Sequence, residues 1–79
     1  MSSELSIDVE VDVQGLSCPL PILRAKKALS GMASGQMLQV LATDSGAWDD
    51  FDYFCKNAGH ALLSREEKEG VYRFVIRCR

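Results

Sequence analysis

Hydrophobic and polar residues alternate along the first part of the chain. The apolar members of this alternation are Leu5, Ile7, Val9, Val11 and Val13. Polar or charged residues occupy the positions between them, up to Gln14. A period of two is typical of a strand with one buried face. The pattern therefore predicts a strand over residues 5–14, ended by the turn that begins at Gly15.

The spacing of apolar residues then changes to that of a helix. Pro19 and Pro21 suit a first helical turn, because the amides there have no acceptor within the helix. The apolar positions that follow, at i, i+3, i+7 and i+10, are Ile22, Ala25, Leu29 and Met32. This spacing predicts a helix from Pro19 to about Met32, with glycines marking its end.

The remaining chain predicts a strand, a second helix and two more strands. Residues 37–43 are almost continuously apolar and suit a central strand. A helix over 47–58 is expected next, with Asp44 or Ser45 as its N-cap and Gly59 as its C-cap. Its apolar face is formed by Ala47, Phe51, Phe54, Cys55 and Ala58. Strands over 60–65 and 71–78 complete the pattern, joined by a charged, solvated hairpin end over 65–69.

This order of elements, β-α-β-α-β-β, predicts the fold class. Two helices can cover one face of a four-stranded mixed sheet and leave the polar residues of the first strand on the other face. We therefore expect an α/β two-layer sandwich that forms a single domain over residues 1–79. In the last strand, the residues expected to face the helices are Tyr72, Phe74, Ile76 and Cys78.

Composition narrows the possible functions. The 79 residues are 47% hydrophobic and 25% charged, and the formal net charge is −2. A slightly acidic chain without a basic, aromatic-rich strand argues against direct binding of nucleic acid or of an anionic membrane surface. No apolar run approaches the length of a membrane span, and residues 1–10 do not resemble a signal peptide. We expect a cytoplasmic monomer.

The three cysteines, Cys18, Cys55 and Cys78, are odd in number and widely spaced. They cannot form a fully paired disulfide framework, and with His60 as the sole histidine no metal site is expected. Cys18 stands apart because it lies between a strand and a helix, immediately before Pro19. This cap position favours the thiolate form through the helix dipole, with the amides of Leu20 and Ile22 as expected donors. The alternative is an incidental loop cysteine.

The residues around Cys18 form a recognisable motif. Residues 12–21 read Asp-Val-Gln-Gly-Leu-Ser-Cys-Pro-Leu-Pro. This run closely resembles the D-x-x-G-L-x-C-P-x-P motif of the TusA/SirA-like sulfur-carrier family, and the resemblance extends over almost the whole chain. The motif positions that support Cys18 are Asp12, Gly15, Pro19 and Pro21.

The resemblance implies a two-layer sandwich whose Cys18 accepts sulfane sulfur as a persulfide, without a cofactor. The donor would be a cysteine desulfurase or a rhodanese, and a downstream protein would accept the sulfur. In the branch that acts in tRNA thiolation, the motif resembles Cys-Pro-Glu-Pro, whereas Leu20 stands between the prolines here. Molybdenum-cofactor maturation and sulfur oxidation are the other pathways that remain open. A non-catalytic regulatory or protein-interaction domain with the same fold is the alternative function.

Other residues have candidate roles near Cys18. On the expected first helix, a set of residues faces away from the apolar stripe: Leu20, Leu23, Arg24 and Lys27. Exposed leucines flanked by basic groups suggest a partner-docking surface, although single exposed leucines are also common.

Asp12 and Asp50 are candidates for holding loops near the thiol. Cys55 and Cys78 are expected to pack as small hydrophobic residues, with a redox role as the alternative. For Trp48, core packing and a surface contact are equally compatible with the sequence.

Overall fold

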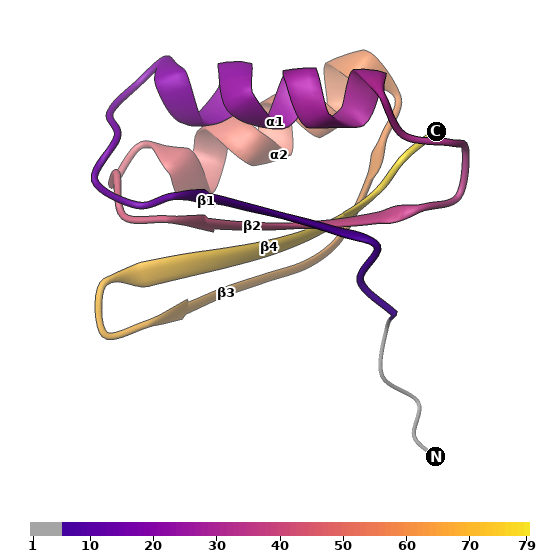
Figure 1. Ribbon diagram of the computed structural model, residues 1–79. Helices are drawn as coiled ribbons and strands as arrows, with labels where there is room; N and C mark the ends of the chain where they lie inside the picture. The colour runs from indigo at the N-terminus through magenta and orange to yellow at the C-terminus, as the bar shows by residue number, and fades with distance from the viewer. Residues whose placement is uncertain (1–5) are drawn as a thin grey trace.

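Six elements of secondary structure follow one another in the predicted order (Figure 1). The computed structural model describes residues 6–79. The elements are β1 (Val9–Val13), α1 (Leu20–Ser30), β2 (Met37–Ala42), α2 (Ala47–Ala58), β3 (Ala61–Lys68) and β4 (Val71–Arg77). Over the described residues, neither helix combines the length and the hydrophobicity that a membrane crossing requires.

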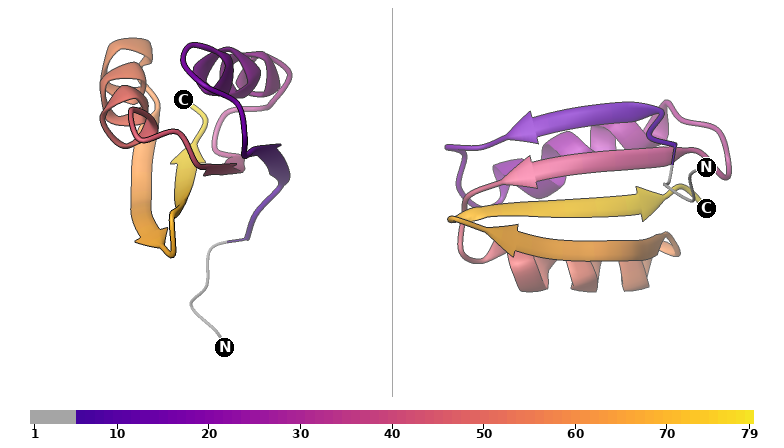
Figure 2. Two further views of the ribbon diagram at one scale, coloured as in Figure 1. Left: turned by 90° about the vertical axis from the view of Figure 1, so that its left-hand side faces the viewer. Right: turned by 90° about the horizontal axis from the view of Figure 1, so that it is seen from below.

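The four strands form one mixed sheet in the order β1-β2-β4-β3. β1 and β2 are parallel, as the α1 crossover between them requires, and the other two pairs are antiparallel. Both helices lie against the same face of the sheet, and the opposite face is open (Figure 2). The predicted two-layer α/β sandwich is therefore confirmed. It places the β1–α1 loop and the first turn of α2 at the same end of the molecule (Figure 1).

The strand boundaries differ from those expected at both edges of the sheet. β1 begins at Val9 rather than at residue 5, and Leu5 lies outside the described residues. The pairing of β1 with β2 starts at Val9, because the residue before it, Asp8, ends the row of strand pairs. The Asp8 amide donates to the Met37 carbonyl, and the Asp8 carboxylate accepts the Met37 amide at 2.8 Å. β3 extends to Lys68 rather than stopping at residue 65, because β4 pairs with it over this whole length. The predicted charged hairpin end is therefore mostly strand.

The hairpin turn itself is reduced to two residues, Glu69 and Gly70. Both have positive φ, 52° and 83°. Positive φ at both central positions defines the turn type that matches the twist of two antiparallel strands. The exposed ion pair of Arg73 with Glu66, at 3.8 Å, bridges the two strands.

The bounds of α1 and the N-cap of α2 differ from the prediction, and α1 begins at Leu20 rather than at Pro19. α1 ends at Ser30 rather than near Met32, because Gly31 caps it: the Gly31 amide donates to the Ala28 carbonyl and the Met32 amide to the Leu29 carbonyl. α2 has Gly46 as its N-cap, and neither Asp44 nor Ser45 caps it with a side chain. The Asp44 backbone carbonyl instead accepts the Ala47 amide, which turns the chain before the helix begins.

The core lies between the helices and the sheet. The largest fully buried side chains in it are Phe51, Phe74, Leu38, Ile76, Val13, Val40 and Cys55. Phe51 of α2 stacks on Phe74 of β4 with the ring centroids 4.5 Å apart. The buried positions of α1 are Pro21, Ala25 and Leu29, so Pro21 takes the place expected of Ile22, which is half-buried. Trp48 contributes to packing beside this core, 5.8 Å from Tyr72 and 6.4 Å from Phe74 between ring centroids.

Candidate functional site

The loop that carries Cys18 is held by hydrogen bonds close to the end of β1. The Asp12 carboxylate accepts the Gln14 amide at 3.0 Å, as a residue that holds this loop should. Gly15 has a φ of 83°, a conformation that favours glycine, and its amide donates to Thr43 Oγ1 at 2.8 Å. Thr43 follows β2, so this bond ties the loop to the neighbouring strand. Thr43 was not expected from the sequence.

Cys18 lies one residue outside the cap position predicted for it. The N-cap is Pro19, and Leu20 is the first helical residue. The Leu20 amide, expected as a donor to the sulfur, instead donates to the Ser17 carbonyl at 2.9 Å. Pro21 is buried in the first turn and anchors the helix start to the core. Cys18 itself is exposed, so the loop presents its thiol at the surface of the molecule.

A shallow cleft of about 310 Å³ opens beside the Cys18 thiol. Cys18, Pro19 and Ile22 form its wall on the α1 side. The opposite wall comes from α2 and consists of Asp50, Tyr53, Phe54 and Asn57. Asp50, a candidate from the sequence, is therefore brought to Cys18. Tyr53 and Asn57 were missed, although the spacing of the α2 wall, i, i+3, i+4 and i+7, marks one stripe of a helix.

The four candidate docking residues are exposed, as predicted. Leu20 and Leu23 are 42% and 51% exposed, and Arg24 and Lys27 are also classed as exposed. None of these residues lines the cleft at Cys18. Since successive helical residues are rotated by about 100°, they lie on the side of α1 that faces away from α2, whereas Ile22 faces the cleft. The thiol therefore has an exposed helix face on one side and the cleft on the other.

The other two cysteines are buried, as expected of packing residues. Burial and, to a smaller extent, the nearby Asp52 carboxylate together raise the pKa of the Cys55 thiol to about 11. Cys78 Sγ donates to the backbone carbonyls of Leu29 and Met32, at 3.8 and 3.9 Å. These contacts link the end of β4 to the C-terminal end of α1.

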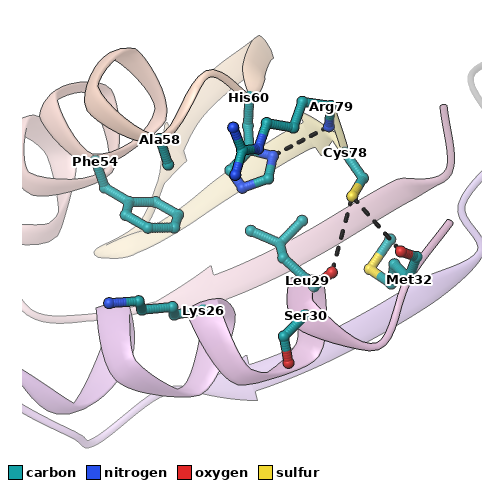
Figure 3. A pocket seen from close by; sticks show the side chains of 9 residues that line it. All are labelled: Lys26, Leu29, Ser30, Met32, Phe54, Ala58, His60, Cys78 and Arg79. Carbon is teal, nitrogen blue, oxygen red and sulfur yellow. Dashed lines mark hydrogen bonds between the residues drawn. The ribbon is translucent and has the colours of Figure 1, made fainter. Parts of the chain in front are cut away.

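A second cleft, of about 330 Å³, lies between the last turns of α1 and α2 (Figure 3). Its lining residues are Lys26, Leu29, Ser30, Met32, Phe54, Ala58, His60, Cys78 and Arg79. His60 Nδ1 accepts the Arg79 amide at 3.1 Å. Partial burial, and then the charge of Arg79, lower the pKa of His60 below its usual value. Because His60 follows the end of α2 and Cys18 precedes the start of α1, the imidazole and the thiol belong to opposite ends of the helix pair.

The fold and the site define a class of protein. The molecule is a small α/β sandwich that displays one thiol on a braced loop beside a shallow cleft. Within residues 6–79, no three histidine, cysteine, aspartate or glutamate side chains gather as they would around a metal ion. A thiol displayed in this way can exchange sulfur with a group that another protein brings to the surface.

Comparisons with known proteins agree with this class. Residues 9–78 match the family model described as "Sulfurtransferase TusA". The sulfur carrier protein TusA of Allochromatium vinosum is 53% identical over 70 residues, which cover 89% of this chain and 92% of that protein. A candidate sulfur carrier protein of Neisseria meningitidis serogroup A is 58% identical over 66 residues, covering 84% and 89% of the two chains. The protein belongs to the TusA family.

A solved structure supports the same assignment. The crystal structure of a SirA-like protein from Desulfitobacterium hafniense superposes with a TM-score of 0.80 at 28% identity, covering 89% of this chain and 96% of that one. The resemblance to TusA/SirA-like sulfur carriers is therefore confirmed. Membership of this family implies a role in sulfur transfer, in contact with proteins that supply and accept sulfur.

Proposed function

We propose that the protein is a sulfurtransferase of the carrier type that holds one sulfane sulfur atom as a persulfide on Cys18. The observation that carries this proposal is the exposure of the thiols. All three cysteines lie within the described residues, and only Cys18 is exposed. An exchange reaction between two proteins needs an accessible thiolate and no enclosed substrate pocket. The shallow clefts of this molecule suit a substrate that arrives on another protein.

The transfer would take place in two balanced exchange steps. In the first, the Cys18 thiolate attacks the terminal sulfur of a persulfide on the donor, a cysteine desulfurase or a rhodanese. The Cys18 S–S bond forms, the S–S bond of the donor breaks, and the donor cysteine leaves as a thiolate. In the second, a thiolate of the acceptor protein attacks the same terminal sulfur, and Cys18 leaves. No external oxidant, reductant or cofactor enters either step.

The exposed face of α1 supports a role in guiding these partners. Leu20 and Leu23 expose apolar surface directly after Cys18, and Arg24 and Lys27 add positive charge beside them. An apolar patch with a polar rim is typical of a protein interface. The double substitution Leu23→Glu with Lys27→Glu should slow transfer and leave the fold intact, because both side chains are exposed. Unchanged rates with a donor and with an acceptor would contradict this docking role.

The carrier function is tested by the mass of the intact protein. After incubation with a cysteine desulfurase and cysteine, or with a rhodanese and thiosulfate, we expect the protein to gain one sulfur atom. Cys18→Ser should gain none. Cys55→Ser should still gain one, which controls for the substitution of a cysteine. A sulfur atom found on Cys55 or Cys78, or no gain with either donor, would overturn the proposal.

The acceptor defines the pathway, and three remain candidates: tRNA thiolation, maturation of molybdenum-cofactor enzymes and sulfur oxidation. Leu20 replaces the glutamate expected of a carrier for tRNA thiolation, and this favours the other two. Trapping partners as mixed disulfides with Cys18, in a variant that lacks the two buried thiols, would identify the acceptor. An acceptor of the tRNA thiolation pathway would refute the preference based on Leu20.

A further inference from the structure

The two clefts between the helices share a wall. Phe54 lines both of them. On α1, Ile22 lines the cleft at Cys18 and Lys26, one turn later, lines the second cleft. The clefts therefore follow one another along the helix pair, and we refer to them together as the interhelical groove. It begins at Cys18 and reaches Arg79, and Figure 3 shows the end that Arg79 lines.

The chemistry of the interhelical groove changes along its length. At the Cys18 end the walls are mostly apolar, and the one acidic side chain is Asp50. At the far end, the nine lining residues include Lys26, His60 and Arg79 and no side-chain carboxylate. This concentration of basic groups is unexpected in a chain with a net charge of −2. A groove of this kind complements a ligand that is apolar near the thiol and negatively charged further away.

Two of the three basic side chains, Arg79 and His60, are held by local contacts. The Arg79 side chain packs on Gly59, where a β-carbon would lie 3.3 Å from Arg79 Cδ. His60 Nδ1 accepts the Arg79 amide, so the neutral imidazole carries its hydrogen on Nε2 and can donate. Lys26 comes from the facing helix. α1, the residue after α2 and the residue at the end of the chain thus each contribute a nitrogen-bearing side chain to this end of the groove.

We propose that the interhelical groove binds an extended segment of the polypeptide that exchanges sulfur with Cys18, with a carboxylate side chain of that segment at the Lys26 and Arg79 end. This inference rests on the proposed function and adds a sequence requirement for the partner. α1 rises about 9 Å from Leu20 to Lys26 and about 15 Å to Ser30, at 1.5 Å per residue, and Cys18 lies two residues before this helix. An extended chain advances about 3.3 Å per residue, so the carboxylate should lie about four to six residues from the reactive cysteine.

Short acceptor peptides test this requirement directly. Each contains one cysteine and, five residues away on either side, a glutamate or a lysine, with apolar residues between them. Cys18 is first loaded by inorganic polysulfide: the thiolate attacks the terminal sulfur, the polysulfide S–S bond breaks, and a polysulfide one sulfur shorter leaves. Loading is therefore independent of any partner protein. The peptide thiolate then attacks the terminal sulfur, the Cys18 S–S bond breaks, and the peptide leaves as a persulfide. The rate constant for transfer is measured by mass spectrometry at low ionic strength.

At least one of the two glutamate peptides should accept sulfur about threefold to tenfold faster than its lysine counterpart. In the double variant Lys26→Glu with Arg79→Glu this preference should reverse, and in Lys68→Glu, a matched charge change away from the groove, it should persist. Raising the salt concentration should weaken the preference. Lys26→Gln removes a positive charge without adding repulsion, and it should abolish most of the preference for the glutamate peptide. It serves as a second variant if the double variant is unstable.

The outcomes separate this inference from the proposed function. If Cys18 does not acquire sulfur, the carrier function fails. If loading and transfer proceed but the glutamate and lysine peptides react equally in the wild type, the inference about the groove is wrong. It is also wrong if Lys68→Glu alters the preference as much as the groove variants do, because the effect would then come from the overall charge of the protein.

Discussion

Removal of the Cys18 thiol should leave the folded protein almost unreactive toward alkylating reagents, although two cysteines remain. The reason is the environment of Cys55. It is 1% exposed, and its pKa is raised from 9.0 to about 11. Each pKa unit changes the thiolate fraction about tenfold at a pH below both values, so Cys55 should hold about one hundredth of the ordinary thiolate at pH 8. Cys78 is also buried, with its S–H group donating to backbone carbonyls.

The assay compares native and urea-unfolded Cys18→Ser with the native wild type during treatment with iodoacetamide at pH 8. Native wild type should gain one adduct quickly, on Cys18. Native Cys18→Ser should react at least about a hundredfold more slowly than the same variant in urea, where both remaining thiols are exposed and titrate normally. Intact mass gives the number of adducts, and peptide mapping gives their positions.

Two results would refute this reasoning. One is rapid modification of Cys55 in native Cys18→Ser, which would mean that its burial and raised pKa do not protect it. The other is a second rapid adduct on the native wild type. Either would also remove the main physical reason for assigning the persulfide to Cys18. The variant Cys55→Ala serves as a control, since it should leave the fast phase of the wild type unchanged.

Three further predictions concern the stability of the fold. Phe51→Ala should lower the free energy of unfolding by about 3–5 kcal/mol in urea titrations, because it empties the centre of the core; a loss below about 1 kcal/mol would contradict this packing. Partial burial, and then the charge of Arg79, hold the folded pKa of His60 below its usual 6.5, so the unfolded chain binds the proton more readily. Stability should therefore fall as the pH drops below about 6.5, and His60→Gln should flatten this part of the profile of urea midpoints against pH; an unchanged profile would exclude His60 as its source. Arg65 lies 4.3 Å above the Trp48 ring and donates to the Trp48 carbonyl at 2.9 Å. Arg65→Ala should therefore cost about 1–2 kcal/mol and shift the fluorescence of this tryptophan to the red, whereas an unshifted spectrum would argue against the contact.

The order and type of the elements could be predicted because local periodicity reports which face of an element is buried. The apolar face of α2 and the glycine at its end both agree with the structure. The boundaries were less accurate, because pairing and capping bonds between distant residues determine them. β1 is shortened by the bonds of Asp8 to Met37, and β3 is lengthened by its pairing with β4.

In the candidate site, too, local features could be predicted and contacts between distant residues could not. The sequence alone singled out Cys18 within a motif and predicted the exposed leucines of the following helix. It also suggested that Asp12 holds the loop, and the bond to the Gln14 amide agrees. The bond between Gly15 and Thr43, 28 residues apart, could not be foreseen, because no local pattern encodes it. The hydrogen bond from the Leu20 amide to the Ser17 carbonyl was not predicted, because the exact start of the helix depends on the packing of Pro21.

For this protein, the sequence by itself determined the two helices and the four strands and singled out Cys18 as the candidate nucleophile, since composition, spacing and turn residues act locally. Only the tertiary structure decided what surrounds the nucleophile. The sheet places α1 and α2 side by side on one face (Figure 2), which brings Tyr53 and Asn57 to Cys18. The end of β4 brings Arg79 to the same groove as Lys26. The cleft beside the thiol and the basic end of the groove are each built from both helices. Neither helix contains the information for them alone, because a surface between two elements exists only once they pack.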